Sequence, residues 1–172
     1  MSAEAAVATL RAAGLTVAAA ESLTGGQVCV ALSEAAGSSS VFVGGVVTYT
    51  VETKVRLLGV DAELLARHGP VAPEVAQQMA AAAKRRTGAD VAVATTGVAG
   101  PQPHGGHPPG FAYIGWAVAD RQGAVEVRLS GDRATVRSGV TQLALGVVEQ
   151  CARVGGVVAE ELPRWANAVN RE

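Results

Sequence analysis

The stretch AESLTGG at residues 20–26 decides the fold of this chain, because it joins a strand-like apolar run to a helix-like one. Residues 15–20 are apolar and predict a buried strand, whereas apolar side chains return at helical spacing between residues 24 and 35. We therefore expect residues 22–26 to form a strand-to-helix turn. A hydroxyl at such a turn, next to the free backbone N–H groups of a helix start, can serve as a nucleophile or help to hold an anion.

Strands and helices alternate along the rest of the chain. Helices are expected at residues 4–13, 24–35, 52–58, 61–68 and 73–87, and from the cap Asp132 to the glycines at 155–156; strands are expected at 15–20, 41–49, 90–95, 111–119 and 125–129. A turn at residues 121–123 is predicted to join the last two strands into a hairpin, and residues 97–110 form a long loop. This order predicts a three-layer α/β/α sandwich with a mostly parallel mixed sheet.

Length and composition indicate one globular domain. The chain has 172 residues, of which 49% are hydrophobic and 17% charged, enough for one sizeable core and short for two. We expect a single domain over residues 1–172, with a core at about 4–154 and a tail at 155–172. The many Ala and Val residues are compatible with association into a homo-oligomer.

Charge and cysteine content indicate the cellular setting. A net charge of -1 and a pI near 6.3 give no electrostatic reason to expect nucleic acid or an anionic membrane as partner. Cys29 and Cys151 lie on apolar helical patterns and are expected to be reduced core thiols. No basic-then-apolar leader and no membrane-spanning run is present, so we expect a cytoplasmic protein.

Polar and glycine-rich segments follow three of the predicted strands. They comprise residues 22–26, 48–54 and 95–101, and ligands of open α/β sheets bind beyond the carboxyl ends of the strands, so the three segments are expected to line one crevice. Arg133, at the start of the last long helix, suits phosphate recognition. No P-loop and no Gly-x-Gly-x-x-Gly follows a predicted strand, and Tyr49 and Lys54 miss the spacing of a short-chain dehydrogenase, which disfavours P-loop hydrolysis and hydride transfer.

A hydroxyl nucleophile requires a base, and the chain offers few. The available hydroxyls are those of Ser22, Thr24, Ser38, Ser39, Ser40, Thr95 and Thr96. A desolvated lysine can deprotonate and act as the base. Of the two lysines, Lys84 lies within a helix beside two arginines at its carboxyl end, which leaves Lys54 as the credible base.

Each of these assignments has a structural alternative. Ser22 could cap the following helix, Lys54 could be a solvated helix residue, and Tyr49 could face the core from a strand. Arg133 could pair with a surface carboxylate. His104 and His107 are interpreted as loop residues rather than metal ligands, because no acidic partner accompanies them, and no metal or other cofactor is expected.

Six motifs in unbroken order resemble the CinA C-terminal domain family. They are AESLTGG at 20–26, AGSS at 36–39, VTY at 47–49 with Lys54, HG at 68–69, TGVAGP at 96–101 and GDR at 131–133. The resemblance covers residues from about 4 to 152. The family includes nicotinamide-nucleotide amidohydrolases, also called NMN deamidases, which use a Ser/Lys pair without metal.

The resemblance implies hydrolysis of the carboxamide of nicotinamide mononucleotide to nicotinic acid mononucleotide and ammonia, in pyridine nucleotide recycling. It implies Ser22 as nucleophile, Lys54 as base and Tyr49 as a residue that assists the pair. Arg133 is expected near the nucleotide phosphate. Including backbone positions for substrate or oxyanion, the expected substrate-binding residues are Thr24, Gly25, Gly26, Thr96, Gly97 and Arg133.

Two segments depart from the family pattern. The family usually carries Tyr-Ser-Asn-Glu-x-Lys, whereas Thr-Val-Glu-Thr separates Tyr49 from Lys54 here, which leaves open whether Lys54 reaches Ser22. The family loop motif Lys-Pro-Val-Gly is replaced by His-Pro-Pro-Gly at residues 107–110. One alternative is a non-catalytic nucleotide-binding or regulatory module of the same fold. A metal-dependent phosphohydrolase is a further alternative, which the shortage of clustered carboxylates disfavours.

Overall fold

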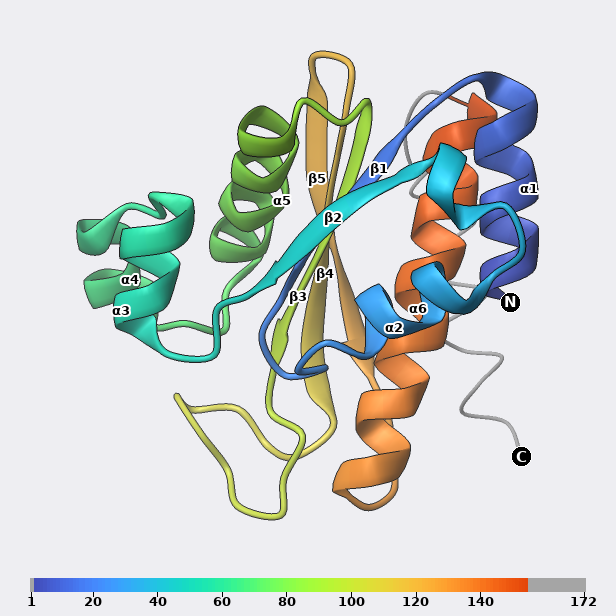
Figure 1. Ribbon diagram of the computed structural model, residues 1–172. Coiled ribbons are helices and arrows are strands. Elements are labelled where there is room, and N and C mark those ends of the chain that lie inside the picture. Colours follow the sequence, from blue (N-terminus) through green and yellow to red (C-terminus); the bar gives the residue numbers. More distant parts are fainter. Residues whose placement is uncertain (1, 155–172) are drawn as a thin grey trace.

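Five strands form one mixed sheet in a computed structural model that describes residues 2–154 (Figure 1). The order across the sheet is β2-β1-β3-β4-β5. β1 pairs in parallel with β2 and β3, whereas β4 is antiparallel to both β3 and β5. The expected mixed α/β fold is confirmed. The strands are β1 Val17–Glu21, β2 Phe42–Val47, β3 Val91–Gly97, β4 Phe111–Val118 and β5 Arg121–Arg128.

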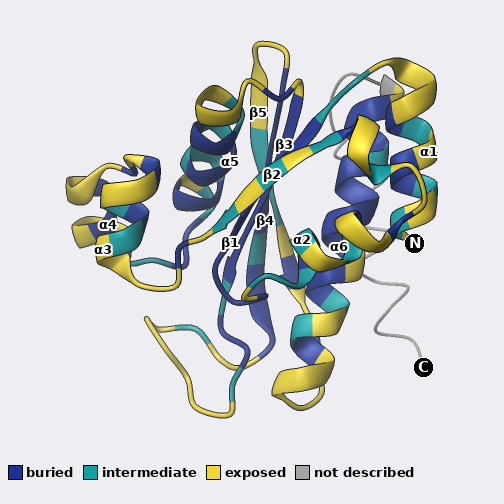
Figure 2. Ribbon diagram, in the orientation of Figure 1, coloured by how far each residue is buried: buried dark blue, intermediate teal, exposed yellow. Residues whose placement is uncertain are grey.

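Helices cover both faces of the sheet and make three layers (Figure 1). On one face lie α1 Ala3–Ala13, α2 Gln27–Glu34 and α6 Arg133–Val154. On the other lies α5 Pro73–Thr87, with α3 Val51–Thr53, the π-helical turn η2 Lys54–Leu58 and α4 Ala62–His68 beyond it. A short 3-10 turn, η1 Ser38–Ser40, precedes β2. Figure 2 shows that the central strands are buried between the layers.

Strand alternation divides the core between the two faces. Val91 and Val93 of β3 belong to the cluster under α1 and α6, while Ala92 and Ala94 belong to the cluster under α5. The small side chains on the second face let α5 lie close to the sheet. At Gly115 of β4 a methyl group would collide with the backbone of α5, so glycine is required there.

Helices α4 and α5 begin where the sequence predicted, because local residues stabilise their first turns. Asp61 accepts hydrogen bonds from the first N–H groups of α4, and Pro73 begins α5, as predicted. Lys84, Arg85 and Arg86 lie in the last turn of α5, where cations favour the negative end of the helix.

The hairpin turn is two residues earlier than predicted. Ala119 and Asp120 form the turn, with Ala119 at a φ of 50°, and β5 already begins at Arg121. The prediction of a turn at residues 121–123 was wrong because Gly123 serves packing instead. It pairs with Trp116 across the hairpin, and a side chain at this position would collide with the indole ring.

Helix α2 begins at Gln27, three residues later than expected. Gly25 and Gly26 adopt φ values of 62° and 104°, which extend the turn before the helix. Both cysteines are free. The predicted helix end at 155–156 and tail at 155–172 lie outside the described residues. Within residues 2–154, no helix is long and apolar enough to cross a membrane.

Candidate active site

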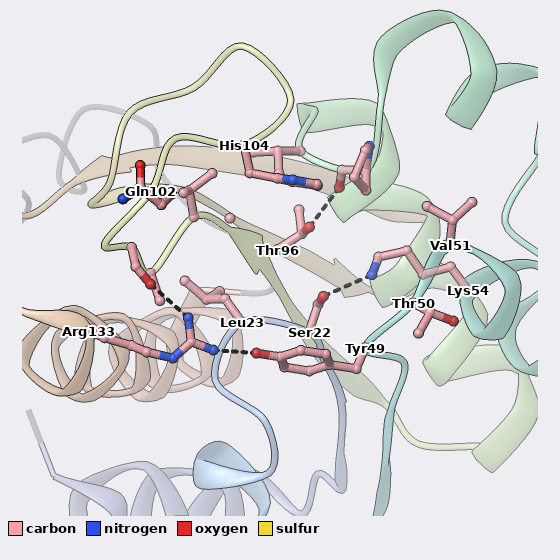
Figure 3. Close-up of a pocket in the computed structure, with 16 residues that line it drawn as sticks. Ser22, Leu23, Tyr49, Thr50, Val51, Lys54, Thr96, Gln102, His104 and Arg133 are labelled. Atoms are coloured by element: carbon pink, nitrogen blue, oxygen red, sulfur yellow. Dashed lines mark hydrogen bonds between the residues drawn. The ribbon is translucent and has the colours of Figure 1, made fainter.

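A cavity of about 390 Å³ opens beyond the carboxyl ends of β1 and β3 (Figure 3). The three segments that the sequence placed at one crevice all contribute to it, together with the start of α6. The lining includes Ser22, Leu23, Tyr49, Thr50, Lys54, Pro70, Thr96, Gly97, Gly100, Gln102, His104 and Arg133.

Ser22 and Lys54 meet in the wall of this cavity. The Lys54 Nζ donates a hydrogen bond of 2.8 Å to the Ser22 Oγ and another of 2.7 Å to the carbonyl oxygen of Thr48. Ser22 does not cap α2, and Lys54 is only 1% exposed, so neither structural alternative describes these side chains. A hydroxyl held against a buried amine is the arrangement that nucleophilic catalysis requires.

The altered segment between Tyr49 and Lys54 still delivers the lysine to the serine. Thr50 caps the short helix α3, because its hydroxyl accepts from the backbone N–H of Thr53 while the Thr53 hydroxyl accepts from the N–H of Thr50. The wider turn η2 then begins at Lys54 and directs its side chain inward. Reciprocal threonine capping therefore closes this turn without the asparagine of the family pattern.

Burial changes the proton affinity of Lys54. Desolvation lowers its pKa from 10.5 to about 8, because a charged amine is disfavoured away from water. Within the described residues no carboxylate forms an ion pair with it. At pH 7 about one Lys54 side chain in ten is therefore neutral and able to accept a proton.

Glu21 precedes Ser22, and its side chain lies on the other face of the sheet, where it binds the start of α2. Its buried carboxylate accepts backbone N–H groups of Gly26 at 2.9 Å, Val28 at 3.1 Å and Cys29 at 2.8 Å. It thus satisfies the amino end of α2, which has no capping side chain of its own. Because neighbouring strand residues point to opposite faces, fixing Glu21 in α2 directs Ser22 toward Lys54.

Arg133 lies across the opening from Lys54, and Tyr49 lies between them, beside Ser22 (Figure 3). Arg133 donates one hydrogen bond to the Tyr49 hydroxyl and another, of 2.9 Å, to the carbonyl oxygen of Gly100. Both residues are exposed, and Tyr49, at 54% exposed, does not occupy the core position considered for it. Among residues 2–154, Arg133 forms no ion pair with a surface carboxylate. A guanidinium at the rim is suited to binding an anion at the mouth of the cavity.

Thr96 and Gly97 line the cavity, whereas Thr24, Gly25 and Gly26 do not. The Thr96 hydroxyl donates to the carbonyl oxygen of Pro70 at 2.7 Å. The buried Thr24 hydroxyl bonds to that of Thr95, also at 2.7 Å, and therefore fixes the turn rather than facing a ligand.

The loop after β3 forms the outer wall. His104 and His107 bond to one another through their backbones across a two-glycine turn. His104 lines the cavity, while the His107 ring stacks on Phe111 with centroids 4.3 Å apart. In residues 2–154, no three His, Cys, Asp or Glu side chains gather into a metal-binding group.

Two residues near the site carried no predicted role. Glu21 could have been found as an acidic residue that shortly precedes the start of α2, which lacks a side-chain cap. Arg137 donates from Nε to the carbonyl oxygen of Leu23 at 3.0 Å and from a terminal nitrogen to that of Thr24 at 2.7 Å. Its position four residues after Arg133 places both on one face of α6, and that spacing was the available signal.

Sequence comparisons identify relatives of this chain. Residues 1–152 match the family model of the CinA C-terminal domain. A CinA-like protein of Frankia casuarinae is 44% identical over 135 residues, which make up 78% of this chain and 31% of that protein. A Bacillus subtilis protein named as competence-damage inducible is 40% identical over 124 residues, 72% of this chain and 30% of its own length. The chain thus spans about a third of these curated relatives.

Solved structures share the fold over nearly their whole length. A CinA superfamily protein from Klebsiella pneumoniae has a TM-score of 0.85 and 30% identity, covering 88% of this chain and 95% of that one. CihA from Agrobacterium tumefaciens, described as a competence/damage inducible protein, has a TM-score of 0.79 and 37% identity, covering 84% and 91%. The chain therefore belongs to the CinA C-terminal domain family.

Proposed function

We propose that this protein is a serine amidohydrolase that converts nicotinamide mononucleotide to nicotinic acid mononucleotide and ammonia, in pyridine nucleotide recycling. The observation that carries the proposal is the 2.8 Å hydrogen bond between the buried Lys54 amine and the Ser22 hydroxyl at a ligand-sized cavity. Membership in the CinA family is consistent with this chemistry.

The reaction follows from the pair. Neutral Lys54 takes the proton of Ser22 as the Oγ adds to the carboxamide carbon, and it returns that proton to the nitrogen as ammonia leaves. Water then attacks the resulting ester with Lys54 again acting as base, which releases the carboxylate and restores the serine. The serine proton thus leaves with ammonia in the first half of the reaction, and a proton of the attacking water passes through Lys54 to the Ser22 Oγ in the second half.

The opening of the cavity is suited to the phosphate end of the nucleotide. Arg133 lies at the opening and offers bidentate donors to a phosphate, and Tyr49 orients its guanidinium through their hydrogen bond. Nicotinamide riboside lacks the phosphate. Relative to the mononucleotide, its KM should therefore be raised by a larger factor than its kcat is lowered. The two substrates together separate recognition by Arg133 from chemistry at Ser22.

Ammonia release from nicotinamide mononucleotide tests the proposal. Lys54→Met should reduce kcat by about 10²- to 10⁴-fold, the range for a missing general base, and Ser22→Ala, which removes the nucleophile, should reduce it by at least as much. Lys84→Met is the matched control, because it removes the other lysine of the chain, on α5, and should retain wild-type turnover. Wild-type turnover in either site variant would refute the pair. Saturable nucleotide binding without turnover by the wild type would instead support a non-catalytic module.

A further inference from the structure

The backbone N–H groups around Ser22 are mostly engaged. The N–H of Ser22 donates to the carbonyl oxygen of Thr95 at 2.9 Å, and that of Gly25 donates to Ser22 at 3.1 Å. The N–H of Gly26 is bound by the Glu21 carboxylate. The serine's own amide and both glycine amides are thus unavailable to an incoming ligand.

Two consecutive N–H groups in this turn remain without an acceptor. Within the described part of the chain, those of Leu23 and Thr24 donate no hydrogen bond, although both residues are buried. Buried backbone donors are nearly always paired in folded proteins. Because they directly follow Ser22 and Leu23 lines the cavity, an oxygen atom of a ligand bonded to Ser22 is the acceptor that this position suits.

Arg137 fixes the peptide group that carries the Thr24 donor, whereas the peptide that carries the Leu23 donor is held by the hydrogen bond from the Gly25 N–H to the Ser22 carbonyl oxygen. The Arg137 guanidinium binds the carbonyl oxygens of Leu23 and Thr24 from the α6 side. In a trans peptide the C=O and N–H point in opposite directions, so holding the Leu23 carbonyl toward α6 directs the Thr24 N–H away from it. Gly25 leaves room for this contact, because a methyl group there would approach the guanidinium to 3.0 Å.

We infer that the N–H groups of Leu23 and Thr24 are the oxyanion-binding donors of the Ser22 site, and that Arg137 is a positioning residue that orients the Thr24 donor through the Leu23 carbonyl. The inference deepens the proposed function and requires from it only that Ser22 is the nucleophile. When the Ser22 Oγ adds to a carbonyl carbon, the π electrons of the carbonyl move to its oxygen. The serine proton passes to Lys54, and the two N–H groups bind the resulting negative oxygen.

Binding of pyridine-3-boronic acid tests this inference without depending on turnover. The Ser22 oxygen adds to the boron and its proton passes to Lys54, which leaves a tetrahedral boronate anion that resembles the oxyanion. The tetrahedral boron is observed by ¹¹B NMR, and its affinity is measured by calorimetry. The full chain is compared with Arg137→Met, which removes the guanidinium, and with Arg137→Lys, which can reach one carbonyl.

Arg137→Met should weaken the boronate by about tenfold or more and lower kcat for nicotinamide mononucleotide by a similar factor, with KM nearly unchanged. Arg137→Lys should recover part of both losses. Arg153→Met is the control, because Arg153 lies on the same helix, is exposed and forms an ion pair with Glu149. It should match the wild type in both measurements.

Three outcomes would overturn the inference. They are unchanged boronate affinity in Arg137→Met with a native melting temperature, an equal loss in the Arg153 control, and absence of a boronate adduct in the wild type. If the wild type binds the boronate in the expected manner but does not hydrolyse nicotinamide mononucleotide, the proposed substrate fails and the role of Arg137 stands.

Discussion

Replacing Lys54 by methionine should change how the stability of this protein depends on pH. The folded protein lowers the pKa of Lys54 from 10.5 to about 8 by burying its amine, so between these values the unfolded chain binds more protons than the folded one. Stability therefore rises with pH across this window and falls as pH drops through about 8. Methionine has a similar length and no titrating group, so its variant lacks this contribution.

The magnitude follows from the two pKa values. A tenfold change in proton affinity corresponds to about 1.4 kcal/mol, so charged Lys54 costs the fold about 3 kcal/mol at pH 7. At pH 10 only about 1 kcal/mol of this cost remains, because this pH is close to the pKa of the unfolded lysine and removing its proton on folding costs little. The wild type should thus gain about 2 kcal/mol relative to Lys54→Met between pH 7 and pH 10. Loss of the hydrogen bonds to Ser22 and Thr48 changes the offset of the two curves, not this slope.

Urea unfolding at several pH values between 7 and 10 measures this difference. Other titrating groups are shared by both proteins and cancel in the comparison. Lys84→Met serves as the control and should run parallel to the wild type. Parallel curves for the wild type and Lys54→Met would refute the argument, because they would mean that the buried amine keeps its ordinary proton affinity.

Three further predictions concern rate, cap and packing. The kcat/KM for amide hydrolysis should rise about tenfold per pH unit and level off above about pH 8 as Lys54 becomes neutral; a flat profile from pH 6 to 9 would contradict this. Glu21→Gln should cost about 1–3 kcal/mol in denaturant unfolding, because its amide group presents a donor to a backbone donor, whereas the exposed Glu34→Gln should cost little. Gly45→Ala should destabilise by about 1–3 kcal/mol through collision with the Cys29 sulfur, and Cys29→Ala should restore part of the loss.

The sequence predicted those elements whose signals are local. Asp61 and Pro73 mark helix starts by their own chemistry, and α4 and α5 begin where these residues indicate. The grouping of Ser22 and Lys54 near one cavity also followed from reasoning about strand ends, since parallel strands present their carboxyl ends at one edge. Family resemblance was needed to connect these two residues to a particular amide.

Features set by contacts between distant segments were not predictable in this way. Gly123 had the local signature of a turn, yet its role is to leave room for the Trp116 ring on the neighbouring strand. The roles of Glu21 and Arg137 depend on groups that no sequence spacing specifies, namely the amides at the start of α2 and the carbonyls of the Ser22 turn. A glycine or a charged residue in the sequence is compatible with several structural roles, and the packing around the sheet determines which role it has.

At the ends of β1 and β3, side chains on one face of the sheet stabilise the fold, and side chains on the other face line the candidate active site. Glu21 faces α2 while Ser22 faces Lys54, and the paired strand repeats the division at the hydroxyls of Thr95 and Thr96. A slip of β1 by one residue would exchange the two faces and place the Glu21 carboxylate beside the Lys54 amine. An adjacent carboxylate stabilises the charged amine and raises its pKa, so the lysine could no longer accept a proton near neutral pH. The register that pairs Glu21 with Thr95 is therefore a requirement of the proposed chemistry as well as of the fold.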